Sequence, residues 1–349
     1  MRILRFIFFP FSIIYWLITA VRNLFYNRKI MKSSKFSIPV INVGNLSMGG
    51  TGKTPHVEYL IRLLKEDFKT ATLSRGFGRK ERGFIIADAK ASANRIGDEP
   101  FQYYKKFKDD IVVSVEANRV LGAMDLFRIH PDINVLLLDD AYQHRSIYAG
   151  INILLTDYNH PFYKDFILPV GNLRESRLGK KRADIIIVTK CPSLSDGEKN
   201  KIKSKIKPTT HQQLFFSHIK YGDVCKFNGE KINLSGSKVI LVTGIANAAP
   251  LKSYLESNAE VLHHFNFPDH HTFKESELEE IHNIFDKFAA ESPLIVTTEK
   301  DAMRLLDKAF EKVIEKYPWC YQQIEIEIDN HQQFDELILK YVKENNPDS

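Results

Sequence analysis

The stretch "VGNLSMGGTGKTP", residues 43–55, decides how the rest of the chain is interpreted. The segment before it, 37–43, is short and rich in β-branched residues, which predicts a buried strand. From Lys53 onward apolar residues recur at helical spacing, and Pro55 suits a first helical turn, where a missing N–H has no partner to lose. The glycines therefore lie between a strand and a helix N-terminus, the setting that a phosphate-binding loop requires.

The residue types in this loop predict a nucleotide site with ATP and Mg²⁺ as cofactors. We expect the phosphates to contact Ser47, Met48, Gly49, Gly50, Thr51, Gly52, Lys53 and Thr54. Lys53 would reach the β- and γ-phosphates, and the Thr54 hydroxyl would ligate Mg²⁺. Ser47 stands where the P-loop pattern begins with glycine. An ordinary glycine turn is the alternative, but it gives no reason for the Lys-Thr pair.

Apolar runs and helical segments alternate along the rest of the chain. Runs at 110–115, 133–140, 150–157, 183–190, 237–244 and 292–298 each end in a polar turn. Strands buried on both faces, with helices between them, predict a parallel sheet covered on both sides. The fold class is thus α/β: a P-loop-type parallel sheet flanked by helices, with a second, smaller α/β domain.

A composition change near 215–237 marks the junction between the two domains. The segment alternates in polarity and contains Asn228-Gly229, a strong hairpin signal. The predicted limits are an amphipathic membrane-associated helix over 1–30, a P-loop domain over 31–215, a β-hairpin-like linker over 216–237 and a C-terminal α/β domain over 238–349.

The N-terminal segment is both apolar and basic. Residues 6–21 carry no charge, and residues 1–57 hold eight Lys or Arg and no Asp or Glu, so the net charge of +6 resides there. The uncharged stretch is shorter than the ~20 residues that span a bilayer, and Pro10 interrupts it. These features predict a helix lying in the membrane interface, attracted to anionic lipid. A true span, a helix buried in the protein and a cleaved signal peptide are the alternatives.

The remaining composition excludes other classes. Basic residues are not spread over the folded body, so no nucleic-acid partner is predicted. The three cysteines are far apart and form no CxxC motif, which indicates neither a disulfide framework nor a zinc ribbon. Histidines at 263, 264, 270 and 271 suggest a metal, but no clear ligand set accompanies them.

Three carboxylates stand out by position. Asp139 and Asp140 end an apolar strand at its carboxyl end, where open α/β sheets place ligands, and we predict that they hold Mg²⁺. A turn or helix-capping role suits one of them as well. Asp98, in the sequence GDEP, precedes a predicted helix and could merely cap it.

Taken together, the motifs resemble the lipid A 4′-kinases (tetraacyldisaccharide 4′-kinases), a membrane-associated P-loop family. The matching pieces, in the family's order, are VGNLSMGGTGKTP, LSRGFGR, GDEP, LLDDAYQHR, LPVGNLRES, FPDHHTF and TTEKDAMRL. The sequence departs from the family at Phe77, at Ala141-Tyr142 and at Ser176.

The resemblance implies a P-loop kinase that transfers the γ-phosphate of ATP to the 4′-hydroxyl of a lipid-linked glucosamine disaccharide 1-phosphate, in lipid A biosynthesis. It implies a peripheral or monotopic protein on the cytoplasmic face of the inner membrane, and no obligate protein partner is evident.

The resemblance also implies roles for particular residues. The aspartate matching Asp98 is the proposed base, assisted by the histidine matching His270, and Lys53 is the third catalytic residue. A positioned carboxylate can accept the proton of a sugar hydroxyl during phosphoryl transfer. The residues expected at the substrate are Arg75, Phe77, Arg119 and Arg174. Each of these arginines could instead be a solvated surface residue.

Other classes of protein remain open at this stage. A membrane-associated P-loop ATPase or GTPase switch would share the loop and the strand-end aspartate, but VTKCP at 188–192 lacks the aspartate of a base-reading loop. A soluble small-metabolite kinase gives the N-terminal segment no role, and a non-catalytic nucleotide sensor is the last alternative. Dependence of ATP consumption on a lipid acceptor separates these classes.

Overall fold

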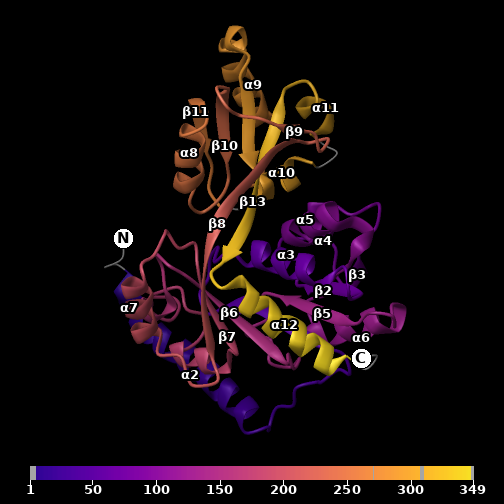
Figure 1. Ribbon diagram of the computed structural model, residues 1–349, viewed down its shortest axis with the longest axis vertical. Helices are drawn as coiled ribbons and strands as arrows, with labels where there is room; N and C mark the ends of the chain where they lie inside the picture. Colours follow the sequence, from indigo (N-terminus) through magenta and orange to yellow (C-terminus); the bar gives the residue numbers. More distant parts are fainter. Residues whose placement is uncertain (1–4, 270, 307–309, 347–349) are drawn as a thin grey trace.

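The computed structural model describes residues 5–269, 271–306 and 310–346. It forms two α/β units joined by two long strands, β8 (Gln213–Lys226) and β13 (Trp319–Ile328), as Figure 1 shows. Short 3₁₀ turns occur at Phe6–Phe8, Lys108–Asp110, Phe162–Lys164, Arg177–Arg182 and Ala289–Glu291. The predicted α/β fold class is confirmed.

The first unit is built on a parallel sheet in the order β8-β7-β6-β1-β5-β2-β4-β3, in which only the edge strand β3 is antiparallel to its neighbour. Its strands are β1 (Val40–Asn45), β2 (Thr70–Ser74), β3 (Ile85–Ile86), β4 (Val112–Val115), β5 (Val135–Asp139), β6 (Ile151–Asp157) and β7 (Ile185–Thr189). Its helices are α3 (Lys53–Leu64), α4 (Ala93–Ile96), α5 (Asp98–Phe107), α6 (Arg119–Ile129) and α7 (Asp196–Ile206). The central strands are buried along almost their whole length, as continuous apolar runs require.

The second unit has the strand order β11-β10-β12-β13. It comprises β10 (Lys238–Thr243), β11 (Glu260–Asn266) and β12 (Leu294–Thr298), with helices α8 (Ala249–Glu256), α9 (Glu275–Lys287), α10 (Glu299–Leu305) and α11 (Glu311–Ile314). β10, β11, β12 and β13 all run parallel to one another.

The pairing of β8 fixes how the two sheets face each other. β8 is parallel to β7 and antiparallel to β13. Strands of the two sheets therefore run in opposite directions, and the carboxyl ends of both sheets point toward the space between the units. This is the edge at which parallel α/β sheets bind ligands.

The segment between the units differs from a simple hairpin. β8 does turn at Asn228-Gly229 into the short strand β9 (Lys231–Ile232), with Gly229 at a φ of +92°. The physical connection, however, is the long β8/β13 ribbon.

The last helix, α12 (His331–Asn345), corrects the predicted C-terminal limit. Its Phe334, Ile338 and Val342 are buried in the same core as Ile41 and Leu60 of the first unit. β13 runs back along β8, so the chain returns to the first unit before α12 begins. The sequence analysis placed all of 238–349 in one domain, because no local pattern shows which sheet a C-terminal segment covers.

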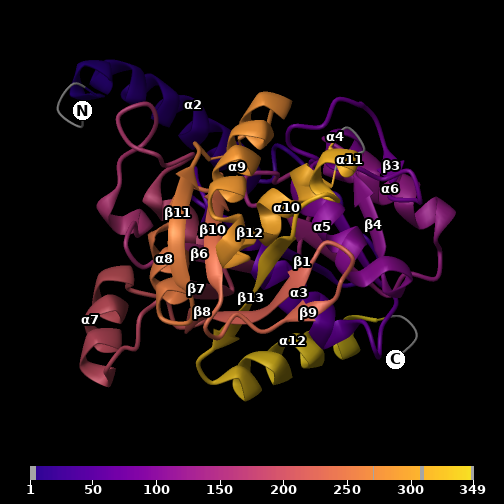
Figure 2. The ribbon, with the colours of Figure 1, turned by 90° about the horizontal axis from the view of Figure 1, so that it is seen from above.

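Helix α2 (Phe9–Asn27) lies on the outside of the first unit, away from α12 (Figures 1 and 2). With the preceding turn it forms an apolar helix over Phe6–Asn27 that is long enough to cross a membrane by length and composition, and 11% of its apolar window is buried. Its exposed apolar side chains include Phe6, Ile7, Phe11, Ile14, Trp16 and Ile18. The alternative of a helix buried in the protein does not fit this exposure.

Candidate active site

The predicted phosphate loop connects β1 to α3 at the carboxyl edge of the first sheet. Met48, Gly49 and Gly50 are exposed, whereas Ser47 and Thr51 are buried. Gly49 and Gly52 have φ angles of +107° and +83°, in the region that favours glycine. The loop backbone is thus shaped and open to a ligand, at the N-terminus of a helix.

Neighbouring strands hold the loop in place. The Asn45 side chain donates to the Thr51 hydroxyl at 2.9 Å, and the Thr189 hydroxyl donates to the Thr51 carbonyl at 2.9 Å. Lys190 Nζ contacts the Gly50 carbonyl and lies 3.0 Å from Asp157 Oδ2. Lys190 belongs to the VTKCP segment, where the sequence showed only a missing aspartate and gave no signal for this contact.

Asp139 is a buried carboxylate beneath the loop. Its Oδ2 accepts hydrogen bonds from the hydroxyls of Tyr103, at 3.3 Å, and Ser74, at 3.4 Å. Its Oδ1 is buried and has no hydrogen-bond partner within the described part of the chain. Burial, together with the charges of Asp140 and Glu99, raises the pKa of Asp139 to about 6.

Asp140, the next residue, differs from Asp139 in that basic side chains surround it and its pKa is lowered. Its φ of +51° turns it out of the strand. Arg174 donates to its two oxygens at 2.9 and 3.1 Å, and Lys53 Nζ lies 3.7 Å from Oδ1. Burial opposes ionisation of Asp140, but the charges of Lys53 and Arg174 prevail and lower its pKa. The structure therefore brings Lys53, Asp140 and Arg174 together.

Thr54 is connected to the same group of side chains. The Tyr103 hydroxyl is hydrogen-bonded to the Thr54 side chain as well as to Asp139. Burial raises the pKa of Tyr103 well above its usual value, so this hydroxyl stays protonated. Tyr103 had no role in the sequence-based prediction, because a tyrosine inside an amphipathic helix is most often a core residue.

Asp98 lies in the first turn of α5 and faces the second unit. Arg304, from α10, donates to Asp98 Oδ2 at 2.8 Å through Nε and at 2.6 Å through Nη2. Asp301, which is fully buried, holds the other side of this guanidinium at 2.8 Å. Arg304 was part of a quoted motif, TTEKDAMRL, but its contact is with a residue 206 positions away.

The histidine predicted to assist, His270, lies outside the described residues. Its neighbour His271 bonds Glu277 at 2.8 Å and stacks on Phe267, with ring centroids 4.5 Å apart. His271 therefore belongs to the structure of the second unit.

The predicted substrate residues divide into two groups. Arg75 and Phe77 are exposed, Phe77 to 66%, and are open to a ligand. Arg119 is 1% exposed and donates to the main-chain carbonyls of Glu116, Ala117 and Asp139. It supports the strand end from beneath, and this burial opposes the direct substrate contact that we predicted.

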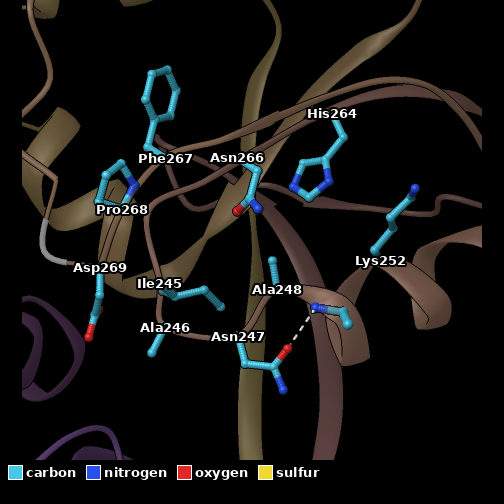
Figure 3. A pocket seen from close by; sticks show the side chains of 11 residues that line it. Ile245, Ala246, Asn247, Ala248, Lys252, His264, Asn266, Phe267, Pro268 and Asp269 are labelled. Carbon is cyan, nitrogen blue, oxygen red and sulfur yellow. Dashed lines mark hydrogen bonds between the residues drawn. The ribbon is translucent and has the colours of Figure 1, made fainter. Parts of the chain in front are cut away.

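The second unit contributes a cavity of about 490 Å³ beside the carboxyl ends of β10 and β11. Figure 3 shows its lining: Ile245, Ala246, Asn247, Ala248, Ala249, Lys252, His264, Asn266, Phe267, Pro268 and Asp269. The Asn247 side chain accepts a hydrogen bond at 3.2 Å from the N–H of Ala249, the first residue of α8. Amide, ammonium and aromatic groups line one opening here, which suits a polar ligand.

Within the described ranges, no group of three or more His, Cys, Asp or Glu side chains is placed to hold a metal ion. The fold and the site together define a P-loop nucleotide-binding protein. Its strand-end carboxylates lie beside the phosphate loop at the edge of the same sheet, and its second α/β unit lies across the space between the sheets.

Comparison with known proteins identifies the family. The tetraacyldisaccharide-1-P 4′-kinase family matches residues 4–343. The tetraacyldisaccharide 4′-kinase of Flavobacterium johnsoniae is 48% identical over 99% of both chains, and that of Bacteroides thetaiotaomicron is 42% identical over 98% of this chain and 94% of its own. The chain belongs to the tetraacyldisaccharide-1-P 4′-kinase family, and it is a phosphotransferase.

A solved structure agrees with this assignment. The crystal structure of LpxK from Aquifex aeolicus in complex with ATP has a TM-score of 0.75 and 27% sequence identity, and covers 97% of this chain and 99% of that one. Both units and their connection are therefore shared with a solved kinase of this family.

Proposed function

We propose that this protein transfers the γ-phosphate of ATP to the 4′-hydroxyl of a lipid-linked glucosamine disaccharide 1-phosphate, at the cytoplasmic face of the inner membrane. The observation that carries the proposal is the site itself: a phosphate loop with Lys53 and a separate carboxylate, Asp98, at the same sheet edge. Names of the relatives, and the ATP held by the Aquifex kinase, support the substrate pair.

Phosphoryl transfer depends mainly on positioning and on charge. Lys53 stabilises charge on the β- and γ-phosphates, and the open backbone of Met48 to Gly50 cradles them. The acceptor hydroxyl is a weak nucleophile, so Asp98 accepts its proton as the bond to phosphorus forms. Arg304 holds Asp98 in place through two hydrogen bonds. The resemblance to the family implies that His270 assists this base, and we include it in the proposal on that ground.

The side chains present fit a magnesium ion. Mg²⁺ prefers oxygen ligands, and Asp139 has a buried oxygen without a partner in the described residues, next to the Tyr103 hydroxyl that also binds Thr54. Thr54, Asp139 and Asp140 would hold the ion with the help of phosphate oxygens. Bound there, Mg²⁺ would neutralise charge on the β- and γ-phosphates.

The acceptor side is formed by exposed groups and by α2. Arg75 offers a guanidinium for a phosphate or sugar, and Phe77 offers an exposed ring. The exposed apolar face of α2 lies in the membrane interface, so the protein works where its lipid substrate is embedded.

One assay tests the proposal. Full-length protein is incubated with ATP, Mg²⁺ and a lipid disaccharide 1-phosphate in mixed micelles, and the product is analysed by mass spectrometry with fragmentation. We expect one added phosphate on the distal sugar and no transfer to an acceptor that lacks the 4′-hydroxyl. ATP consumption that proceeds equally without lipid would contradict the proposal and favour a P-loop ATPase or GTPase switch.

A further inference from the structure

Helix α2 has a polar inner side as well as an apolar outer one. Ser12 and Thr19 are its buried residues. The Ser12 hydroxyl donates to the Ile167 carbonyl at 3.1 Å and accepts from Val170 N at 3.2 Å. The Tyr15 hydroxyl donates to the Arg174 carbonyl at 3.0 Å. These partners all belong to one segment, residues 165–177, which we name the support loop.

The opposite edge of the support loop contacts the phosphate loop. Arg174 N donates to the Leu46 carbonyl at 2.7 Å, and Met48 N donates to the Asn172 carbonyl at 2.7 Å. Ser47 and Leu173 form an isolated antiparallel bridge between these bonds. The support loop therefore lies between α2 and the start of the phosphate loop, bonded to both.

Arg174 is the residue at which these contacts converge. Its carbonyl binds Tyr15, its N–H binds Leu46, and its guanidinium binds Asp140. A shift of the Arg174 main chain would therefore move the guanidinium that binds Asp140. Asp140 Oδ1 itself lies 3.7 Å from Lys53 Nζ. Small displacements of this size are costly in an active site, because transfer depends on aligned reactants.

We propose that Tyr15, with Ser12, is a positioning residue for phosphoryl transfer: α2 sets the place of Arg174 and of the phosphate-loop entrance through the support loop. An anchor alone needs only apolar side chains toward lipid. Directional bonds from the inner side of α2 add nothing to membrane affinity, but they fix where the support loop lies. The membrane helix is thus part of the catalytic scaffold. This inference rests on the proposed function only in that lipid phosphorylation is the activity measured to test it.

Tyr15→Phe tests the idea, since it removes one hydroxyl and keeps the ring. We expect kcat to fall about threefold to tenfold, the range that one lost hydrogen bond allows, while the KM for lipid acceptor and co-sedimentation with vesicles stay unchanged. Tyr26→Phe is the matched control: it lies on the same helix and keeps the ring that the Arg145 guanidinium stacks on, at 5.0 Å. It should behave as wild type.

A double-mutant cycle shows whether Tyr15 acts through Arg174. In an Arg174→Ala background, Tyr15→Phe should lower kcat by a smaller factor than in wild type, because the guanidinium that it positions is already absent while the main-chain bonds to the phosphate loop remain. Additive losses, a wild-type kcat for Tyr15→Phe, or a loss explained by weaker sedimentation would each overturn the proposal.

The dissociation constant of a fluorescent ATP analogue is also measured for each variant of the cycle, because the support loop is bonded to Leu46 and Met48 at the start of the phosphate loop. That readout keeps the test valid if the lipid proves not to be the acceptor. Failure of lipid phosphorylation by wild-type protein would then overturn the proposed function alone.

Discussion

Two aspartates of the site are each held by an arginine, but the two pairs connect different parts of the molecule. Asp140 and Arg174 both belong to the first unit, and Lys53 lies beside them. Asp98 belongs to the first unit, whereas Arg304 comes from the second. The first pair therefore stays together whatever the second unit does, while the second pair exists only when the two units are in contact.

The contact between α5 and α10 combines ion pairs with an apolar cluster that includes Phe101, Ala302 and Met303. Lys300 pairs with Glu99 at 3.1 Å, and Lys106 pairs with Glu299 at 2.8 Å. Lys106 also binds Glu58, a fully buried carboxylate of α3, at 2.8 Å. The residues proposed to bind phosphate thus all lie within one unit, whereas the surroundings of the proposed base, Asp98, depend on the contact between the two units.

Removing Lys53 should have the largest effect. Lys53→Ala deletes the charge proposed to act on the β- and γ-phosphates, so we expect kcat to fall by about a hundredfold or more with the melting temperature little changed. Steady-state kinetics beside a thermal melt measure both. A residual kcat above about a tenth of wild type, a loss below ~1.4 kcal/mol, would contradict the phosphate-loop assignment.

Asp98→Asn should follow, with a loss of about a hundredfold in kcat, because the amide cannot accept the hydroxyl proton. Nucleotide affinity, measured by isothermal titration, should stay within about twofold, since Asp98 is not part of the phosphate loop. If ATP affinity collapses and turnover recovers at saturating ATP, Asp98 belongs to the nucleotide site. The two aspartates would then not have the separate roles proposed here.

The two arginines give a direct comparison of stability. Arg304→Leu leaves Asp98 and the fully buried Asp301 without this partner, and we expect the free energy of unfolding to fall by about 3 kcal/mol. Arg174→Leu should cost about 1 kcal/mol, because that side chain is 25% exposed and solvent screens its pair. Urea unfolding measures both. Equal losses of unfolding free energy would contradict the expectation that the Arg304 pair between the units stabilises the protein more than the Arg174 pair does.

The smallest effect is a pH dependence at Glu299. Burial, and then the charge of Glu58, raise the pKa of Glu299 to about 7 from an ordinary 4.5, although Lys106 opposes this. The folded state thus keeps the proton longer than the unfolded state, so stability should fall as the pH rises from 4.5 to 7.

Glu299→Gln should remove that dependence. We expect a melting temperature about 2–4 °C above wild type at pH 8 and no difference at pH 4.5. Glu325→Gln is the control, since its carboxylate is 48% exposed, beside Arg62. A gain that is equal at both pH values would contradict the titration of Glu299.

The sequence predicted those features whose residues lie close together along the chain, and it did not predict contacts between residues that are far apart in the chain. The phosphate loop and the strand-end Asp139 and Asp140 were predictable, because each rests on a strand or helix signal within a few residues. Arg304 could not be assigned to Asp98, since no local pattern reports a contact across 206 positions. The burial of Arg119 could not be predicted for a related reason: residue type suggests phosphate binding, but the surrounding fold determines whether the side chain is exposed.

The return of α12 to the first unit has a consequence for synthesis of the chain on the ribosome. Phe334, Ile338 and Val342 complete a core whose first members, Ile41 and Val43, emerge some three hundred residues earlier. The strands and helices of the second unit, from β10 to β13, all leave the ribosome before α12 does. The unit that is synthesised first is thus completed last, and the part of its apolar core that α12 covers stays exposed until the end of translation. Such delayed closure is where chaperones act and where truncated chains aggregate.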